Sequence, residues 1–213
     1  MDAWRYICLE GPDCVGKSTM AKRIQAWLAE IGIESIIAPQ PGATALGQKL
    51  RQIIKHDDTI NIGMETEAFV FVLDQMAFVE DLLVEAQKHG VWVISDRNNY
   101  ISALVYQVLN GVDICRLDRF YSIVRSPKLD VTFLLQAPSS TLKNRIDRDS
   151  KRWDRYESNI AFMERVYDAY GNLMNDHRSR LSWISQRCVP INAAADEDAV
   201  FGQIEVELKK LLK

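Results

Sequence analysis

The chain has 213 residues, of which 47% are hydrophobic and 26% charged, with a formal net charge of −3. This length and composition suit one compact domain over residues 1–213, and no linker-like, repeated or low-complexity run divides it. The slightly acidic balance argues against nucleic-acid binding, and we expect neither a secretory leader nor a membrane span, which needs roughly 18 apolar residues.

Short apolar runs alternate with helical patterns in the first half of the chain. We expect strands at Trp4–Leu9, Ser35–Ala38 and Val91–Ser95. The helices expected between them are Lys17–Ile31, Thr44–Lys55 and Glu65–His89. Gly90 directly follows the longest of these helices and is a favourable C-cap residue.

The same alternation continues in the second half. Strands are expected at Val131–Leu135 and Cys188–Ile191. The expected helices are one including Ser102–Leu109, then Asp113–Val124, Ser139–Arg148, Glu157–Asp176 and Glu197–Leu212. Strands that alternate with helices predict an α/β fold, with a five-stranded parallel sheet covered on both faces. Ligands of such sheets bind beyond the carboxyl ends of the strands.

A phosphate-binding loop follows the first expected strand. Residues 11–18 match G-x-x-x-x-G-K-[ST] without deviation, and a chance match is expected in only about one chain of this length in a hundred. The glycines let backbone N–H groups surround phosphate oxygens, Lys17 reaches the β- and γ-phosphates, and the Ser18 hydroxyl ligates Mg²⁺. The residues predicted to bind the nucleotide are Gly11, Pro12, Asp13, Cys14, Val15, Gly16, Lys17, Ser18 and Thr19.

The four cysteines show no pattern of pairing. Cys8, Cys14, Cys115 and Cys188 lie far apart, with neither a CxxC pair nor a zinc-ligand spacing. We therefore expect reduced thiols and a cytoplasmic protein.

Six stretches, taken in order and with their approximate spacing, resemble the thymidylate kinase family of P-loop nucleoside-monophosphate kinases. They are Glu10–Thr19, Pro41–Thr44 with Leu50-Arg51, Phe71–Gln75, Asp96-Arg97 with Tyr106-Gln107, Pro127–Asp130, and Trp153–Glu157. The resemblance implies a P-loop NTP hydrolase fold with a short mobile lid at about residues 147–156. It also implies ATP- and Mg²⁺-dependent phosphorylation of dTMP to dTDP by a homodimer that binds small nucleotides.

The resemblance assigns roles around the acceptor nucleotide. Asp13, a charge that is electrostatically awkward beside phosphates, would bind the 3′-hydroxyl of the sugar, and Tyr106 would exclude a 2′-hydroxyl. Arg97 would grip the acceptor phosphate, with Arg51 as a second candidate, while Asp96 would hold Mg²⁺ through water. The remaining acceptor-side residues would be Phe71, stacked on the pyrimidine, with Gln75 and Ser102. The open alternatives are a structural Asp96–Arg97 pair, solvated Asp13 and Arg51, and core packing for Phe71 and Tyr106.

Four cations, Arg148, Lys151, Arg152 and Arg155, crowd the expected lid. Residues 12–15 contain no Lys or Arg, so the resemblance is to the bacterial subtype in which the lid supplies catalytic charge to the transferred phosphate. Arg148 and Arg152 are the first candidates for that role. The alternative is a solvated charged face.

Several residues depart from the family pattern: Cys14, Pro39-Gln40, Gln75 and Gln136. Gln75 stands where relatives carry an arginine that faces the pyrimidine. A divergent member, for example a viral one acting in a host cytoplasm on 5-hydroxymethyl-dUMP, is therefore an alternative. Kinases of other deoxynucleotides or deoxynucleosides and a P-loop switch also remain open, although the chain has neither Glu-Arg-Ser after the third strand nor Asn-Lys-x-Asp.

Overall fold

The computed structural model describes residues 4–55, 59–148 and 160–212. Within these residues the strands β1 (Tyr6–Glu10), β2 (Ser35–Pro39), β3 (Trp92–Asp96), β4 (Val131–Gln136) and β5 (Cys188–Asn192) form one parallel sheet in the order β2-β3-β1-β4-β5. This confirms the expected α/β fold. β1 is central and almost wholly apolar, and all five of its residues are buried, as expected for a strand covered on both faces.

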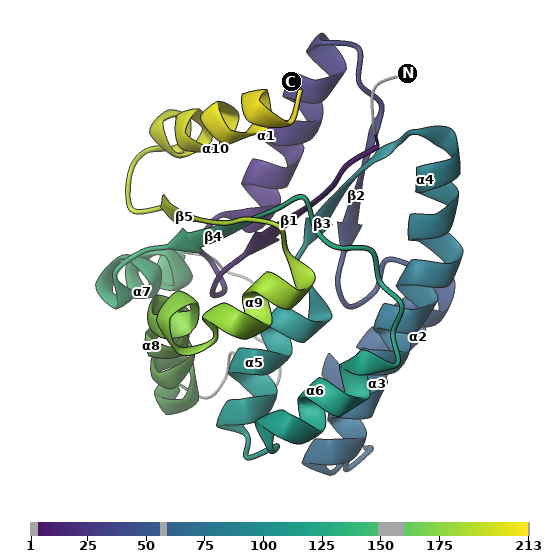
Figure 1. Ribbon diagram of the computed structural model, residues 1–213. Coiled ribbons are helices and arrows are strands. Elements are labelled where there is room, and N and C mark those ends of the chain that lie inside the picture. Colours follow the sequence, from purple (N-terminus) through teal and green to yellow (C-terminus); the bar gives the residue numbers. More distant parts are fainter. Residues whose placement is uncertain (1–3, 56–58, 149–159, 213) are drawn as a thin grey trace.

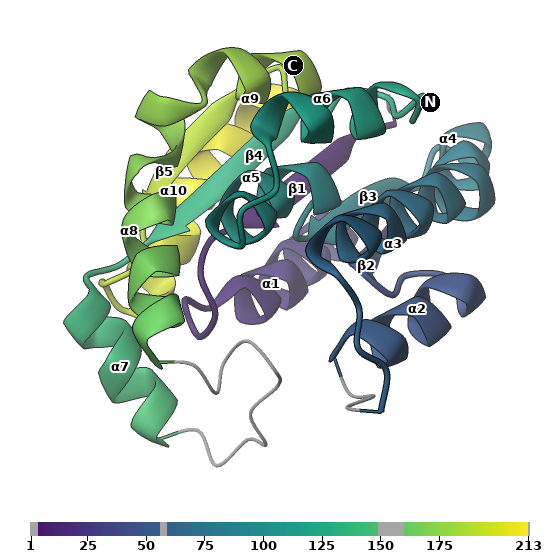
Figure 2. The ribbon, with the colours of Figure 1, turned by 90° about the horizontal axis from the view of Figure 1, so that it is seen from below.

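Helices cover both faces of the sheet (Figure 1). On one face lie α1 (Lys17–Glu30) and α10 (Glu197–Leu211). The other face carries α3 (Met64–Phe78), α5 (Asn99–Leu109), α6 (Ile114–Ser122), α8 (Ile160–Asp176) and α9 (Arg178–Ile184). Two further helices, α2 (Ala45–Lys55) and α7 (Ser139–Arg148), lie on either side of the β1–α1 connection when the molecule is seen from below (Figure 2).

The long helix expected before Gly90 is interrupted by a change of winding. After α3, a π-helical turn, η1 (Val79–Leu83), leads into α4 (Val84–His89). Gly90 then adopts a left-handed conformation, with φ of 70°, and ends the helical stretch as expected. The π turn inserts one extra residue per turn locally, a change of winding that an apolar repeat in the sequence does not reveal.

The observed elements differ in places from expectation. The helix α9 was not predicted, because seven residues with Leu181 alone classed as buried carry too little apolar periodicity. The helix α5 includes the expected stretch Ser102–Leu109, and it begins at Asn99 because the Asn98 side chain accepts hydrogen bonds from the N–H groups of Tyr100 and Ile101 and caps it. Strand β2 includes Pro39, which is tolerated because β2 lies at the edge of the sheet.

Candidate nucleotide-binding site

The phosphate loop joins β1 to α1 at the carboxyl edge of the sheet. Gly11 and Gly16 have φ of 143° and 105°, in a region that side-chain-bearing residues rarely adopt. A Cβ on Gly11 would also lie 2.4 Å from the carbonyl oxygen of Leu135. Cys14 has φ of 59°, so the loop keeps its curvature there with a non-glycine residue. The geometry is that of a concave backbone loop followed by a helix N-terminus, which suits phosphate.

Lys17 is held inside this loop. Its Nζ donates hydrogen bonds to the carbonyl oxygens of Gly11 at 3.0 Å and Pro12 at 2.8 Å, and the residue is only 7% exposed. Burial and the nearby Arg97 charge lower the pKa of Lys17 to about 8. The ammonium is therefore desolvated and poised to gain from contact with phosphate oxygens.

Ser18 and Asp96 meet at the edge of the loop, where the Ser18 hydroxyl donates a 2.6 Å hydrogen bond to Asp96 Oδ2. A hydroxyl and a carboxylate are hard oxygen donors of the kind that Mg²⁺ prefers. Among the described residues, no group of three or more His, Cys, Asp or Glu could hold a metal. The pair therefore fits Mg²⁺ that is bound mainly by nucleotide phosphates and water, as is usual for this ion.

Asp13, Arg97 and Tyr106 form one cluster against the loop, and we call it the acceptor cluster. Arg97 donates to Asp13 Oδ1 at 2.5 Å, the Tyr106 hydroxyl donates to Asp13 Oδ2 at 2.9 Å, and the Arg97 guanidinium lies over the Tyr106 ring at 5.6 Å. Burial alone would raise the pKa of Asp13, but the charges of Arg97 and Lys17 hold it well below its usual range. Asp13 is therefore a carboxylate, and two of the predicted acceptor residues converge on it.

Arg97 is held in an unusual backbone conformation, with φ of 77°. A left-handed conformation at such a residue costs of order 1–3 kcal/mol and persists where surrounding contacts require it. Here those contacts are hydrogen bonds from Arg97 to the carbonyl oxygen of Gly11 at 3.0 Å and the Tyr170 hydroxyl at 2.8 Å. The guanidinium is thereby fixed beside the loop.

Glu10, at the end of β1, holds several residues of the site together through hydrogen bonds. The sequence analysis did not identify it as a site residue. It is fully buried and accepts hydrogen bonds from the N–H groups of Gly11 (3.1 Å) and Asn98 (2.8 Å) and from the hydroxyls of Ser102 and Tyr170 (2.9 Å each). Ser102, predicted on the acceptor side, is thus tied to Glu10. A carboxylate at the end of an otherwise apolar buried strand was the signal that could have identified this role.

The second-strand loop and α2 lie beside the acceptor cluster. Arg51 donates to the carbonyl oxygen of Pro41 at 2.9 Å, and nothing in the described contacts joins it to Arg97 or Asp13. Lys55, one turn further along α2, was not predicted, yet its charge helps lower the pKa of Asp13. The charge of Lys55 on α2 therefore acts on the cluster, and the role of Arg51 at the acceptor phosphate stays a prediction.

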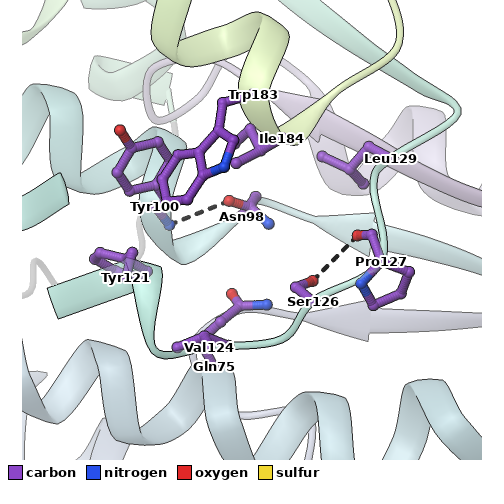
Figure 3. Close-up of a pocket in the computed structure, with 10 residues that line it drawn as sticks. All are labelled: Gln75, Asn98, Tyr100, Tyr121, Val124, Ser126, Pro127, Leu129, Trp183 and Ile184. Atoms are coloured by element: carbon purple, nitrogen blue, oxygen red, sulfur yellow. Dashed lines mark hydrogen bonds between the residues drawn. The ribbon is translucent and has the colours of Figure 1, made fainter. Parts of the chain in front are cut away.

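Phe71 and Gln75 are neighbours one turn apart on α3, and both are buried, at 9% and 2% exposure. The main chain of Phe71 accepts a hydrogen bond from Asn99 Nδ2 at 3.1 Å, which ties α3 to the start of α5. Gln75 lines a cavity together with Tyr100 and Tyr121 (Figure 3). Base stacking by Phe71 and base contact by Gln75 stay predictions.

The lid cations fall largely outside the described residues. Arg148 ends α7, but its side chain, like residues 151, 152 and 155, is not described. A different α7 arginine was missed: Arg145 donates to the carbonyl oxygens of Val15 at 3.2 Å and Ala193 at 2.9 Å. Arg145 therefore anchors α7, and with it the start of the expected lid, to the phosphate loop.

The loop geometry and its place in the sheet define a P-loop nucleotide-binding protein. Comparison with known sequences narrows this class. The sequence model of the thymidylate kinase family matches residues 9–188. A thymidylate kinase from Clavibacter michiganensis is 30% identical, with 97% of this chain and 95% of the relative covered. A probable thymidylate kinase from Thermococcus kodakarensis is 31% identical, at 97% and 98% coverage. The chain belongs to the thymidylate kinase family.

Two further expectations can be compared with the structure. No helix in the described part of the chain is long and apolar enough to cross a membrane. The four cysteines all lie among the described residues, and none forms a disulfide.

Proposed function

We propose that the protein transfers the γ-phosphoryl group of ATP to dTMP, giving dTDP for deoxynucleotide synthesis. The observation that carries this proposal is the acceptor cluster. Asp13 lies within the phosphate loop and binds both Arg97 and Tyr106, so groups suited to a sugar and a phosphate stand directly beside the loop suited to ATP. Family membership supports the same reaction.

On the donor side, the loop amides and Lys17 bind the phosphates of ATP. Ser18 and Asp96 would hold Mg²⁺, which supplies charge neutralisation at the β- and γ-phosphate oxygens when bound. The Lys17 ammonium exchanges its two hydrogen bonds to carbonyl oxygens for contacts with phosphate oxygens. It then stabilises the negative charge that develops on the leaving group during transfer. Arg148 and Arg152 of the lid are proposed to complete this charge compensation.

On the acceptor side, Arg97 grips the dTMP phosphate and thereby aligns it with the donor. The strained backbone and the contacts to Gly11 and Tyr170 hold this guanidinium in place, which reduces the ordering cost of binding. Asp13 accepts a hydrogen bond from the 3′-hydroxyl, and Tyr106, fixed on Asp13, occupies the space that a 2′-hydroxyl would need. Phe71 stacks on the base, and Arg51 assists at the phosphate.

We also propose a homodimer formed through α3. Phe69 and Leu73, one turn apart on α3, are 48% and 44% exposed, and the Phe69 ring lies 4.1 Å from that of Phe120 on α6. Such an apolar face suits a partner copy. Phe69→Asp should produce monomers in light scattering, whereas Val206→Asp, at a 57% exposed site on α10, should not.

We place the one-domain enzyme, with its lid at about residues 147–156, in the cytoplasm.

An acceptor panel with ATP and Mg²⁺ tests the reaction. We expect dTMP to give dTDP with a higher kcat/KM than dUMP, dCMP, dGMP, UMP and thymidine, and 5-hydroxymethyl-dUMP tests the alternative acceptor. Asp13→Ala should lower kcat/KM for dTMP by an amount equivalent to roughly 1–3 kcal/mol, the contribution of a hydrogen bond to a charged group. Asp81→Ala, at an exposed position, should leave kcat/KM unchanged. ATP hydrolysis that no acceptor accelerates would instead indicate a P-loop switch.

A further inference from the structure

Asp74 is a buried carboxylate on α3 that has no part in the phosphate loop or the acceptor cluster. It lies between Phe71 and Gln75 in the chain and is 1% exposed. Burying an ionised side chain is costly unless its oxygens accept hydrogen bonds. Both oxygens of Asp74 accept one, and the two donors come from different elements on the acceptor side. The positions of these donors indicate what the carboxylate does.

The first donor belongs to the loop between β2 and α2. The N–H group of Gly42 donates to Asp74 Oδ1 at 3.0 Å. The helix α2 lies next to α3 (Figure 2), and its first turn approaches the same oxygen so closely that a Cβ on Gly47 would lie 2.3 Å from it. Asp74 therefore fixes both the loop and the start of the helix that carries Arg51.

The same loop holds Arg51 through its stem and its guanidinium. Arg51 Nη1 donates to the carbonyl oxygen of Pro41 at 2.9 Å, and this carbonyl belongs to the peptide unit whose N–H donates to Asp74. The stem lies against the backbone of Gly42, where a Cβ would be 3.1 Å from Arg51 Cδ. Hydrogen bonds at both ends of one peptide unit polarise it and strengthen each other. The guanidinium keeps further N–H donors for a phosphate.

The second donor belongs to the segment that follows Arg97. Asn99 Nδ2 donates to Asp74 Oδ2 at 2.7 Å and to the carbonyl oxygen of Phe71 at 3.1 Å. Asn99 stands two residues after Arg97, the arginine of the acceptor cluster. Asp74 thus joins the backbone beside Arg51 to the backbone beside Arg97, although the two arginines make no direct contact in the described part of the chain.

The charges at this junction are matched. Burial raises the pKa of Asp74, whereas the hydrogen bonds from Asn99 and Gly42 and the positive charge of Arg51 lower it. Hydrogen bonds in such a dry environment are strong, and a buried carboxylate that lost its donors would be costly. The junction is therefore a rigid point from which α2 and the start of α5 are held.

A fixed separation matters for two guanidiniums that bind one phosphate. Ordering a long side chain on binding costs conformational entropy, so an arginine that is already held binds its ligand more tightly. A phosphate held from two sides is also aligned for transfer, and a small misplacement of such a group lowers the rate strongly. The residue that sets the separation is therefore important even when it touches no substrate.

We propose that Asp74 is a positioning residue for the acceptor phosphate, because it holds the Pro41–Gly42 peptide unit that orients Arg51 relative to Arg97. The inference rests on the proposed function, since it takes Arg51 to bind the acceptor phosphate. Without Asp74 the Gly42 N–H loses its acceptor, the peptide unit is free to turn, and Arg51 loses its fixed carbonyl partner. Asp74 acts through this peptide unit and not by contact with a substrate.

The test compares dTMP with thymidine, which has the same base and sugar without the phosphate, in ligand-observed NMR titrations. We expect Asp74→Ala to raise the Kd for dTMP about tenfold and the Kd for thymidine less than about twofold. Asp81→Ala, at an exposed position further along the same helical stretch, should change neither Kd. Asp74→Asn keeps an oxygen for the Gly42 N–H and should recover most of the affinity for dTMP.

A double-mutant cycle then tests the route through Arg51. In the Arg51→Ala background, Asp74→Ala should weaken dTMP binding no further, because the side chain that Asp74 positions is already absent. Asp74→Ser repeats all these measurements if the alanine variant unfolds, since its shorter side chain cannot keep both hydrogen bonds. Formation of dTDP by the native protein is measured separately and tests the proposed function by itself.

Four results would overturn the proposal. Equal weakening of dTMP and thymidine would make Asp74 a packing residue for α2 and α3, and an unchanged Kd for dTMP in Asp74→Ala would remove it from the site. Additive losses in the cycle would show that it does not act through Arg51. Failure of Asp74→Asn to recover affinity would exclude the route through the Gly42 N–H. A native protein that binds dTMP but forms no dTDP would contradict the reaction alone, because the binding cycle does not depend on turnover.

Discussion

Binding of ATP should be accompanied by proton uptake at Lys17. In the ligand-free protein, burial lowers the pKa of this residue to about 8, so that at pH 8 about half of the ammonium groups have lost their proton. Phosphate oxygens stabilise the protonated form and raise the pKa again. ATP binding at pH 8 should therefore take up about 0.5 proton per site, against about 0.1 at pH 7 and about 0.9 at pH 9. A lysine with an ordinary pKa near 10.4 would take up less than about 0.01 at pH 8.

The measurement is titration calorimetry of ATP-Mg²⁺ binding in buffers of different ionisation enthalpy. The slope of the observed enthalpy against the buffer enthalpy gives the number of protons taken up. Lys17→Arg is the control, because arginine keeps its charge and cannot titrate in this range. Uptake that is absent in the wild type, or that is the same in the arginine variant, would refute the reasoning about Lys17.

Four further predictions concern the remaining parts of the site. Arg148→Ala and Arg152→Ala should each lower kcat and kcat/KM together, as loss of a transition-state contact does, and unchanged kcat in both would make the lid cluster a solvated face. Tyr106→Ala should narrow the preference for dTMP over its ribonucleotide, measured as the ratio of kcat/KM values. An unchanged ratio would show that Tyr106 does not exclude the 2′-hydroxyl. Glu10→Gln should lower the free energy of unfolding by about 1–3 kcal/mol in urea titrations, because one side-chain oxygen that accepts hydrogen bonds from buried donors becomes an NH₂ group. An unchanged unfolding midpoint would contradict a stabilising role of Glu10 as a buried acceptor. Gln75→Arg should lower the ratio of kcat/KM for 5-hydroxymethyl-dUMP to kcat/KM for dTMP, since the neutral, shorter glutamine leaves room beside the ring. The same ratio in the native protein and in the variant would show that Gln75 does not set base selectivity.

Much of the fold could be predicted because its signals are local. The strands around β1 are short apolar runs, and the helices between them have their apolar residues at helical spacing. The helix α9 and the π turn at Val79–Leu83 could not be predicted, because tertiary packing rather than periodicity stabilises them. Cap residues set several boundaries, and the start of α5 at Asn99, directly after the capping Asn98, shows that a single side chain decides such a position.

The sequence by itself determined the phosphate loop, because eight consecutive residues carry both its glycines and its lysine, and no distant contact is needed to recognise them. Only the tertiary structure decided which distant residues meet there. Asp13 is 84 residues from Arg97 and 93 residues from Tyr106 in the chain, and the placement of β3 beside β1 brings both of them to its carboxylate. The same packing made Glu10 a buried acceptor for four donors and enclosed Gln75. Burial and hydrogen-bond partners belong to the folded arrangement, because each depends on residues from other elements that no single stretch of sequence contains.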